Sequence, residues 1–249
     1  YVYIGLFDTK EVIRLDGVTG AIVKRISVAP TAPYGLALDK NGSVWVMGRE
    51  TSTGSLTKID VKNATTPDKV TTYTPTQANC NYGITVDPRG YVYTAFNTCL
   101  MRFDPTTAKF EYLTIPGSSQ LRGVGIDNQY NLWVGDSNVG AHHVDVSAAP
   151  PAAGASTMVF KKNVSVVGAW PGTYAGIAID FDNKPWVVSY AGTNSHAIQV
   201  DPNNNYSTFV YNTPTTTADG TLNNSYTYSD MSGYQLRNAS RAGTFRNIF

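Results

Sequence analysis

Charge is scarce in this sequence. Only 15% of its 249 residues are Asp, Glu, Lys or Arg, against roughly 25% in an average soluble protein, and Glu occurs only three times. Lys and Arg (19) nearly balance Asp and Glu (18), so the formal net charge is +1. Such a chain lacks the strong positive field with which proteins hold nucleic acids or anionic membrane surfaces. We therefore expect neither nucleic acid nor a membrane among its partners.

Long apolar runs and helix-favouring segments are also missing. No apolar run approaches the roughly 18 to 20 residues that a membrane-spanning helix needs. Between turn residues the chain is dominated by β-branched and aromatic residues, including 16 Tyr, which excludes a largely helical fold. The chain opens without Met or a signal peptide, in a strand-like stretch at 1–4, so we expect a processed form or a fragment. These features predict an all-β, secreted protein.

Two short phrases repeat along the chain. In the first, a Gly is followed four residues later by Asp and ten residues later by an aromatic residue; its copies occupy 35–45, 83–93, 123–133 and 176–186. The second phrase is a short stretch that ends in Asp. These Asp residues, spaced by 44, 44, 41 and 56 residues, are Asp16, Asp60, Asp104, Asp145 and Asp201. This period suits the four-stranded antiparallel blades of a β-propeller.

Each repeat is interpreted as four strands, a to d from the centre outward. Strand a is the short apolar run after the Gly, such as 35–38, and we expect it to be buried on both faces. Strand b carries the aromatic residue, strand c ends in Asp, and strand d is a polar outer edge such as 69–73. The chain starts in a strand b at 1–5 and ends in a degenerate hairpin at 233–245.

We predict a single domain, 1–249, with five blades. Pairing of the last strand a, at 233–237, with the first strand b would close the ring, and 213–249 would form a long polar loop followed by this closing hairpin. Closure of this kind removes open sheet edges. The alternative is a fragment of a six- or seven-bladed propeller whose first blades precede Tyr1.

Most of the 15 Asp residues fit turn chemistry. Nine of them follow strand a or strand c, where an Asp side chain accepts hydrogen bonds from nearby backbone N–H groups. Besides the five that end the second phrase, they are Asp39, Asp87, Asp127 and Asp180. All nine lie on the face of the a–b and c–d turns. We therefore predict a structural role for them.

The opposite face carries the b–c and d–a loops and surrounds the mouth of the central channel, where propellers commonly bind ligands because several blades converge there. Its aromatic and amide residues suit stacking on sugars or peptides and hydrogen bonding to them; alternatively, the aromatic residues only seal the rim. The candidate binding residues are Tyr34, Arg49, Glu50, Tyr82, Asn97, Arg122, Asp136, Asn138, Trp170, Tyr174, Tyr190, Asn194 and Asp230.

Familiar catalytic motifs are missing. The sequence has no Gly-rich phosphate loop, Ser nucleophile elbow or Cys–His arrangement, and we assign no catalytic residue. His142 and His143 are adjacent in a strand, so they point to opposite faces and make a poor metal chelate. The candidate metal ligands are Asp8, Asp136 and Asp230, whose oxygens suit Ca²⁺ or Mg²⁺.

The two cysteines predict a disulfide. Cys80 precedes strand a of one blade and Cys99 follows strand b of the same blade, and the midpoint between them, 89–90, is the hairpin turn. Antiparallel strands joined there place the two residues nearly opposite each other, within reach of a bridge. A Cys80–Cys99 disulfide indicates an oxidising compartment: extracellular, cell-surface or periplasmic.

The phrase Tyr-Gly-Ile-x-x-Asp-x-x-Gly, followed by an aromatic residue, resembles the blade repeat of NHL and streptogramin B lyase (virginiamycin B lyase)-like propellers over residues 1 to about 212. For these lyases the resemblance implies functional His and Glu residues in two columns of the repeat, with a divalent metal. Here the His column holds Tyr34, Tyr82, Arg122 and Ala175, and the Glu column holds Gly48, Phe96, Asp136 and Ser189. The resemblance therefore implies the propeller fold without the catalytic pattern.

The sequence leaves three classes of function. We favour a secreted or cell-surface, non-catalytic propeller that binds a carbohydrate or a protein or serves as an assembly module. The second is a metal-dependent C–O lyase or hydrolase like the streptogramin lyases, with Asp8, Asp136, Asp230 and Glu50 converging at the mouth. The third is a subunit of an extracellular filament or surface layer, self-assembling or joined to further domains, as a near-zero net charge and Thr-rich edges suggest.

Overall fold

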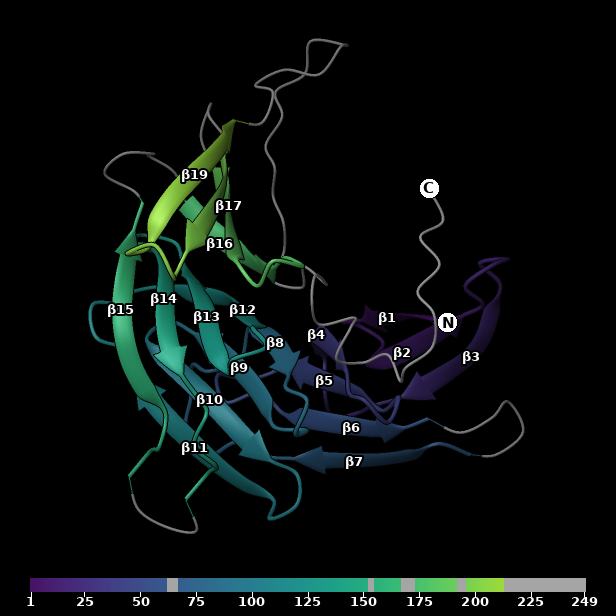
Figure 1. Ribbon diagram of the computed structural model, residues 1–249. Coiled ribbons are helices and arrows are strands. Elements are labelled where there is room, and N and C mark those ends of the chain that lie inside the picture. The colour runs from purple at the N-terminus through teal and green to yellow at the C-terminus, as the bar shows by residue number, and fades with distance from the viewer. Residues whose placement is uncertain (62–66, 152–154, 167–172, 192–195, 213–249) are drawn as a thin grey trace.

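The computed structural model describes residues 1–61, 67–151, 155–166, 173–191 and 196–212. In these ranges the chain forms strands β1 to β19, arranged in one three-stranded and four four-stranded sheets (Figure 1). The described residues include no helix that could cross a membrane. All neighbouring strands within a sheet are antiparallel and follow one another along the chain, so each sheet is a simple meander.

We call the sheets blades 1 to 5 in chain order. Blade 1 contains β1 (Val2–Leu6), β2 (Glu11–Leu15) and β3 (Ile22–Ser27). Blade 2 contains β4 (Pro33–Leu38), β5 (Val44–Gly48), β6 (Leu56–Asp60) and β7 (Lys69–Tyr73). Blade 3 contains β8 (Gly83–Val86), β9 (Val92–Phe96), β10 (Cys99–Asp104) and β11 (Lys109–Thr114). Blade 4 contains β12 (Leu121–Ile126), β13 (Asn131–Asp136), β14 (Gly140–Asp145) and β15 (Val159–Ser165). Blade 5 contains β16 (Thr173–Ile179), β17 (Pro185–Ala191), β18 (His196–Asp201) and β19 (Ser207–Asn212).

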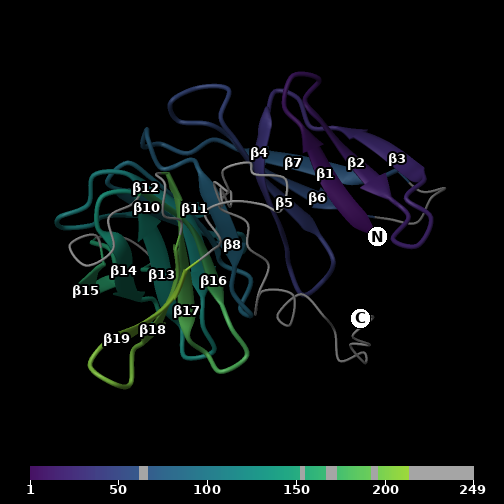
Figure 2. The same cartoon turned by 90° about the horizontal axis from the view of Figure 1, so that it is seen from above.

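The blades stand side by side around an arc, with blades 1 and 5 at its two ends (Figures 1 and 2). Consecutive blades pack through their inner strands: β1 against β4, β4 against β8, β8 against β12, and β12 against β16. This arrangement confirms the predicted β-propeller of five blades. Blade 1 begins at strand b, as expected. The predicted closing strand at 233–237 lies outside the described residues.

The inner strands are less uniformly buried than the sequence predicts. β8 is buried along its whole length, as expected of a strand covered on both faces. In β4 the burial alternates, and Leu36 and Leu38 are only half-buried. Both pack on the side of blade 1, where they meet Tyr3 of β1 and the core cluster around Val12. The face of β4 that looks toward blade 1 is therefore thinly covered within the described residues.

The Asp that ends each strand a explains the repeated phrase. In blade 2, one oxygen of Asp39 accepts hydrogen bonds from the backbone N–H groups of Asn41 (2.9 Å) and Ser43 (3.0 Å), which holds the a–b turn. Its other oxygen accepts a bond from the indole N–H of Trp45 (3.2 Å). Because Trp45 lies on strand b, one carboxylate fixes both the turn and the aromatic residue beside it.

The same arrangement recurs in the other blades. Asp180 accepts the indole N–H of Trp186 at 2.7 Å, and in blade 3 the hydroxyl of Tyr93 replaces the indole and donates to Asp87 at 3.1 Å. The predicted turn role of these Asp residues is confirmed by bonds such as that from the Arg89 N–H to Asp87 (2.9 Å). The constant interval between Asp and the aromatic residue follows from this second bond.

The hydrophobic cores lie between blades. Trp45 of blade 2 is buried and meets Phe103 of blade 3 at 5.8 Å between ring centroids. Trp133 of blade 4 is buried and lies 6.1 Å from the ring of Tyr206 in blade 5. In blades 2 and 4 the aromatic residue of the repeat thus contacts the next blade, whereas Trp186 of blade 5 packs against Tyr211 of its own blade.

Two arginines tie blade 3 to the c–d connection of blade 4. Arg89, in the β8–β9 turn, donates hydrogen bonds to the carbonyl oxygens of Ser147 (2.7 Å) and Val146 (2.8 Å). Arg102 of β10 is completely buried and donates to Glu111 of β11 (2.7 Å) and to the carbonyl oxygen of Ala148 (2.7 Å). These bonds hold the long β14–β15 connection against blade 3, and the bond to Val146 satisfies the carbonyl of a buried residue.

The predicted disulfide is confirmed. Cys80 and Cys99 are bonded, with their Cα atoms 4.9 Å apart. The bond spans the β8–β9 hairpin at the end opposite its turn, and Cys80 lies two residues before Tyr82. The disulfide therefore fixes the end of blade 3 that carries the b–c and d–a loops.

Candidate functional site at the propeller mouth

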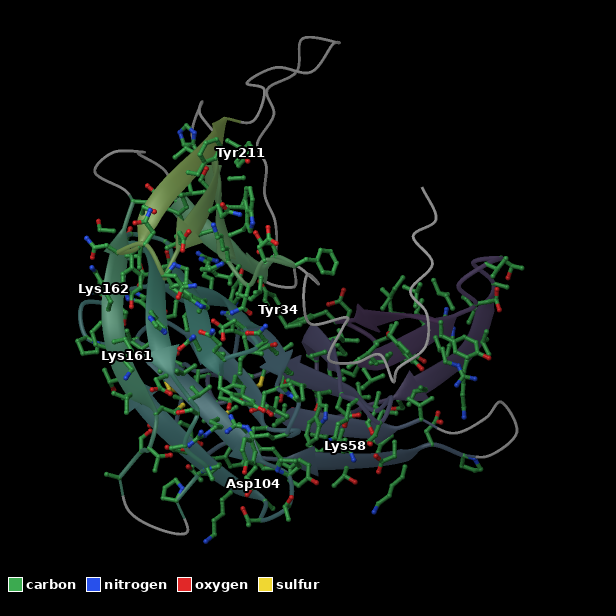
Figure 3. The ribbon with its side chains drawn as sticks, viewed as in Figure 1. Tyr34, Lys58, Asp104, Lys161, Lys162 and Tyr211 are labelled. Carbon is green, nitrogen blue, oxygen red and sulfur yellow. A yellow bond between two sulfur atoms is a disulfide. The ribbon has the colours of Figure 1, made fainter. Side chains whose placement is uncertain are left out.

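Blades 2, 3 and 4 bring a group of arginine and aromatic side chains together at the end that carries the b–c and d–a loops, which we call the mouth. We name this group the arginine–aromatic cluster; its members are Tyr34, Arg49, Tyr82, Phe96 and Arg122. Each lies at the start of a strand a or at the end of a strand b, and antiparallel pairing puts these positions at the same end of a blade. Figure 3 shows Tyr34 on the inner side of the arc, whereas Lys58, Asp104, Lys161 and Lys162 lie on its outer side.

Tyr82 is the centre of the cluster and is only 2% exposed. The Tyr34 ring meets it edge-on at 4.8 Å between centroids, and the Phe96 ring stacks on it at 5.6 Å. Tyr34 and Phe96 are themselves partly exposed. The mouth therefore exposes parts of the Tyr34 and Phe96 rings, and both rings pack on the buried ring of Tyr82.

Arg49 follows β5 and lies over all three rings. Its guanidinium carbon is 4.9 Å from the Tyr34 centroid, 5.0 Å from that of Tyr82 and 4.4 Å from that of Phe96. Such contacts attract a cation to the ring face. Within the described part of the chain, Arg49 forms no ion pair with a carboxylate. Its charge is thus held among aromatic rings at a partly exposed position.

Arg122 reaches Tyr82 from blade 4. It donates hydrogen bonds to the Tyr82 hydroxyl (2.9 Å) and the Ser137 hydroxyl (2.9 Å), and its guanidinium carbon lies 5.1 Å from the Tyr82 centroid. One buried phenol ring therefore contacts guanidinium groups from blades 2 and 4. These contacts join three blades at one point and place two positive charges there.

Tyr34 remains protonated at neutral pH, because its pKa is raised. Burial raises the pKa of Tyr34, and the neighbouring Tyr82 hydroxyl raises it further, although Arg49 works in the opposite direction. Burial also raises the pKa of Tyr174 to about 12. A neutral phenol donates its O–H and presents its ring face, so Tyr34 is suited to hydrogen bonding and stacking at the mouth.

The structure does not bring every sequence candidate into the cluster. Tyr174 is completely buried in the core between blades 4 and 5. Glu50 folds back on its own blade, where its carboxylate accepts the N–H of Ala32 (3.0 Å) and the hydroxyl of Ser55. Asn97 and Asn138 lie in neighbouring b–c loops, partly exposed and exposed, respectively. Trp170, Asn194 and Asp230 lie outside the described residues, as does the side chain of Tyr190.

Asp136 is completely buried, although it is the one carboxylate in the Glu column of the repeat. It accepts hydrogen bonds from the N–H groups of Ser119 (2.9 Å) and Asn138 (2.8 Å), and His142 Nε2 lies 3.2 Å from its Oδ2. Burial acts to raise the pKa of Asp136, but these hydrogen bonds, led by that of His142, hold the pKa below its usual value. Asp136 is an ionised anchor for two loops, with no exposed oxygen.

The described residues at the mouth do not fit a divalent cation. Asp8 lies exposed in the turn after β1, and Asp136 is buried and occupied by its own hydrogen bonds. Among the described residues, no group of three His, Cys, Asp or Glu side chains is close enough to hold a metal ion. Where blades 2 to 4 do meet, Arg49 and Arg122 supply two positive charges, which would repel a metal ion.

Phe96 is the member of the cluster that sequence reasoning missed. Its position in the repeat gave a signal, because it occupies the same column as Asp136 and precedes the candidate Asn97. Because the resemblance implies a functional Glu in this column, an aromatic residue there does not stand out as a site residue. Its stacking on Tyr82 and Arg49 depends on how blades 2 and 3 meet.

A separate hollow of about 540 Å³ lies away from the mouth, along the outer edge strand β11. It is lined in part by Phe110, Tyr112 and Pro150. The hydroxyl of Tyr112 accepts a hydrogen bond from the Thr76 N–H (2.8 Å), which holds the loop after blade 2 against this strand. This hollow is a concave place on the surface that is separate from the arginine–aromatic cluster.

Comparison with known proteins shows the fold. No protein-family model and no curated protein sequence matches the chain. Among solved structures it is similar to virginiamycin B lyase from Staphylococcus aureus (17% identity, TM-score 0.64, covering 86% of this chain and 66% of that one). It is also similar to a streptogramin B lyase (14%, 0.63, 84% and 64%) and to a protein from Lactobacillus plantarum (14%, 0.64, 88% and 68%).

These similarities confirm that the chain has the β-propeller fold seen in virginiamycin B lyase, as the repeated phrase implied. The chain spans about two thirds of the length of these lyases. At such low identity the likeness concerns the fold alone.

Proposed function

We propose that this protein is a secreted or cell-surface β-propeller that binds a carbohydrate at its arginine–aromatic cluster and does not catalyse a reaction. The observation that carries this proposal is the meeting of Tyr34, Phe96 and Arg49 around the buried Tyr82. Partly exposed ring faces bind the apolar faces of sugars, and the neighbouring N–H and O–H groups bind their hydroxyls.

The chemistry of the cluster supports binding rather than catalysis. Eliminations and hydrolyses of the lyase type need a positioned base, together with an electrophile or a metal. The phenol of Tyr34 has a raised pKa, and an arginine stays protonated at all ordinary pH values, so neither accepts a proton near neutral pH. The carboxylate of Asp136 could accept a proton, but it is completely buried and its oxygens already accept hydrogen bonds from the protein.

The Cys80–Cys99 disulfide supports an extracellular or periplasmic location, because such bonds persist in oxidising compartments. Carbohydrates are abundant ligands outside cells. A protein partner is the competing hypothesis, and the binding experiment separates the two.

The experiment measures binding of the purified protein to a broad oligosaccharide panel, with Tyr34→Ala as the test variant and Tyr211→Ala as its control. Tyr211 is exposed on β19, the outer strand of blade 5, whereas Tyr34 lies on β4, the inner strand of blade 2 (Figure 3). We expect the wild type and the control to bind the same sugars and Tyr34→Ala to bind about tenfold more weakly, the loss of one stacking contact.

Absence of binding to any oligosaccharide would contradict the proposal, as would equal binding by the Tyr34→Ala and Tyr211→Ala variants. Cleavage of a bound sugar by the wild type would overturn the non-catalytic part. Circular dichroism and thermal unfolding of each variant serve to separate lost binding from lost folding.

A further inference from the structure

We infer that the ligand of the arginine–aromatic cluster is an acidic carbohydrate, whose carboxylate pairs with the guanidinium of Arg49. This inference rests on the proposed function and names the class of sugar. It begins from the charge of the mouth. The chain as a whole is almost neutral, with a formal net charge of +1, yet Arg49 and Arg122 meet around one phenol ring.

The acids nearest in sequence do not neutralise this charge. Glu50 follows Arg49 directly, but its oxygens accept the Ala32 N–H and the Ser55 hydroxyl. Asp136 lies in the blade of Arg122, but its oxygens accept backbone N–H groups and face His142. Both carboxylates are engaged in holding loops, so within the described part of the chain the positive charge of Arg49 remains available to an anion from outside.

The contacts of Arg49 leave N–H donors of its guanidinium group for that anion. Its guanidinium carbon lies 4.4 to 5.0 Å from the centroids of Tyr34, Tyr82 and Phe96, and its hydrogen bond with the Tyr34 hydroxyl uses only part of its five N–H donors. A carboxylate is bound by the N–H edge, where two parallel donors match its two oxygens. The aromatic rings hold the guanidinium plane in place, so little side-chain entropy is lost when an anion binds.

The rings explain why the anion is carried by a sugar. Tyr34 and Phe96 are partly exposed beside Arg49, and they offer apolar surface to the C–H face of a pyranose. A uronic acid presents such a face together with a carboxylate on the same ring. A sulfated sugar offers a similar combination, but a sulfate ester is a much weaker base than a carboxylate and therefore a weaker acceptor of the arginine N–H bonds.

The test is isothermal titration calorimetry with three matched sets of oligosaccharides. The first set contains oligouronates of galacturonate, glucuronate and mannuronate; the second contains their neutral methyl esters; the third contains sulfated oligosaccharides without uronate. We expect at least one oligouronate to bind, its methyl ester to bind at least tenfold more weakly, and the affinity for the acid to fall as salt is added.

The matched variants are Arg49→Gln, Arg49→Lys and Arg25→Gln. Arg25 lies on the outer strand β3, where it pairs with Glu11, so Arg25→Gln removes the same charge away from the mouth. We expect Arg49→Gln to lose at least tenfold in affinity for the oligouronate while its weak affinity for the methyl ester stays unchanged. Arg49→Lys keeps the charge without the fork and should fall between these values, and Arg25→Gln should match the wild type.

Equal binding of acid and ester, or binding of sulfated sugars alone, would overturn this inference and leave the proposed carbohydrate function intact. An Arg49→Gln variant that binds oligouronates like the wild type would likewise overturn it. Failure of all three sets and of the neutral panel to bind would overturn both proposals.

Discussion

At the scale of single residues, the Asp that ends strand a has two partners, and the loss of either can be measured. In Asp39→Asn the amide oxygen can still accept the backbone N–H groups of the turn. The amide NH₂ group then faces the Trp45 indole N–H, so two donors meet and the indole loses its acceptor. We expect the free energy of unfolding to fall by about 1 to 3 kcal/mol in urea denaturation, because a buried donor loses its acceptor.

The control for this change is Asp16→Asn. Asp16 ends a strand c in an exposed turn, where its carboxylate accepts the N–H groups of Val18 and Thr19 and the Thr19 hydroxyl. We expect a clearly smaller change there, because the Asp16 carboxylate is exposed to water. Equal losses in the two variants would show that the Trp45 bond contributes nothing.

These residues also show how far the sequence alone could be interpreted. The turn role of Asp39 was predictable, because Asp followed three residues later by Gly has a known backbone preference. The repeat keeps a constant spacing between this Asp and the aromatic residue on strand b. That spacing does not reveal that the Trp45 indole N–H donates a hydrogen bond to the carboxylate. The burial of Asp136 was not predictable, since its partners Ser119 and His142 come from different loops and strands.

His143 gives the stability of the protein a dependence on pH. It stacks on Trp133 at 4.6 Å and its Nδ1 lies 2.7 Å from the Tyr206 hydroxyl. Burial lowers the pKa of His143, Lys161 lowers it further, and Asp127 and Asp145 act in the opposite direction. The folded state therefore favours the neutral ring, and the unfolded state binds the proton more tightly.

The sign of the effect follows from this difference. The contribution of His143 to stability is complete above its unfolded pKa of roughly 6.5, and it is lost as the pH falls from there through the lower folded pKa. We expect the unfolding free energy to fall between about pH 7 and pH 5, and His143→Gln to make this slope shallower. A slope unchanged in His143→Gln would contradict the assignment.

At the scale of elements, the buried pair of Arg102 and Glu111 joins β10, β11 and the β14–β15 connection. We expect Arg102→Met to lower the free energy of unfolding by about 3 to 5 kcal/mol, because it leaves the charge of Glu111 buried without its partner. The double variant Arg102→Met with Glu111→Leu should recover most of that loss. Additive losses in a double-mutant cycle would contradict this account.

The elements differ in how well the sequence predicts them. The alternation of apolar residues and turns predicted the strands of the four complete blades, and the hairpin midpoint at 89–90 predicted the disulfide. The attachment of the β14–β15 connection to Arg102 was not predicted. Its partner Ala148 supplies a backbone carbonyl, and nothing in an amino-acid sequence marks a carbonyl that a distant arginine will bind.

At the scale of the whole molecule, closure of the ring stays a prediction from the sequence. The side chains of Val2 (51% exposed) and Ile4 (41% exposed) on β1 offer apolar surface that another strand can cover. We expect a chain ending at 212 to self-associate in light scattering and to unfold at a lower temperature than the full chain, because an open strand edge pairs with other molecules. A chain ending at 245, which keeps 233–237, is the control. Identical behaviour of the two truncated chains would contradict closure by this segment.

The central claim is that the mouth holds an acidic sugar at the arginine–aromatic cluster, and a crystal structure of the protein with the tightest-binding oligouronate tests it most directly. We predict density for a carboxylate against the guanidinium of Arg49 and for a sugar ring over Tyr34 and Phe96. Density for the sugar only in the hollow beside β11, or at any place that leaves Arg49 without contact, would contradict the claim.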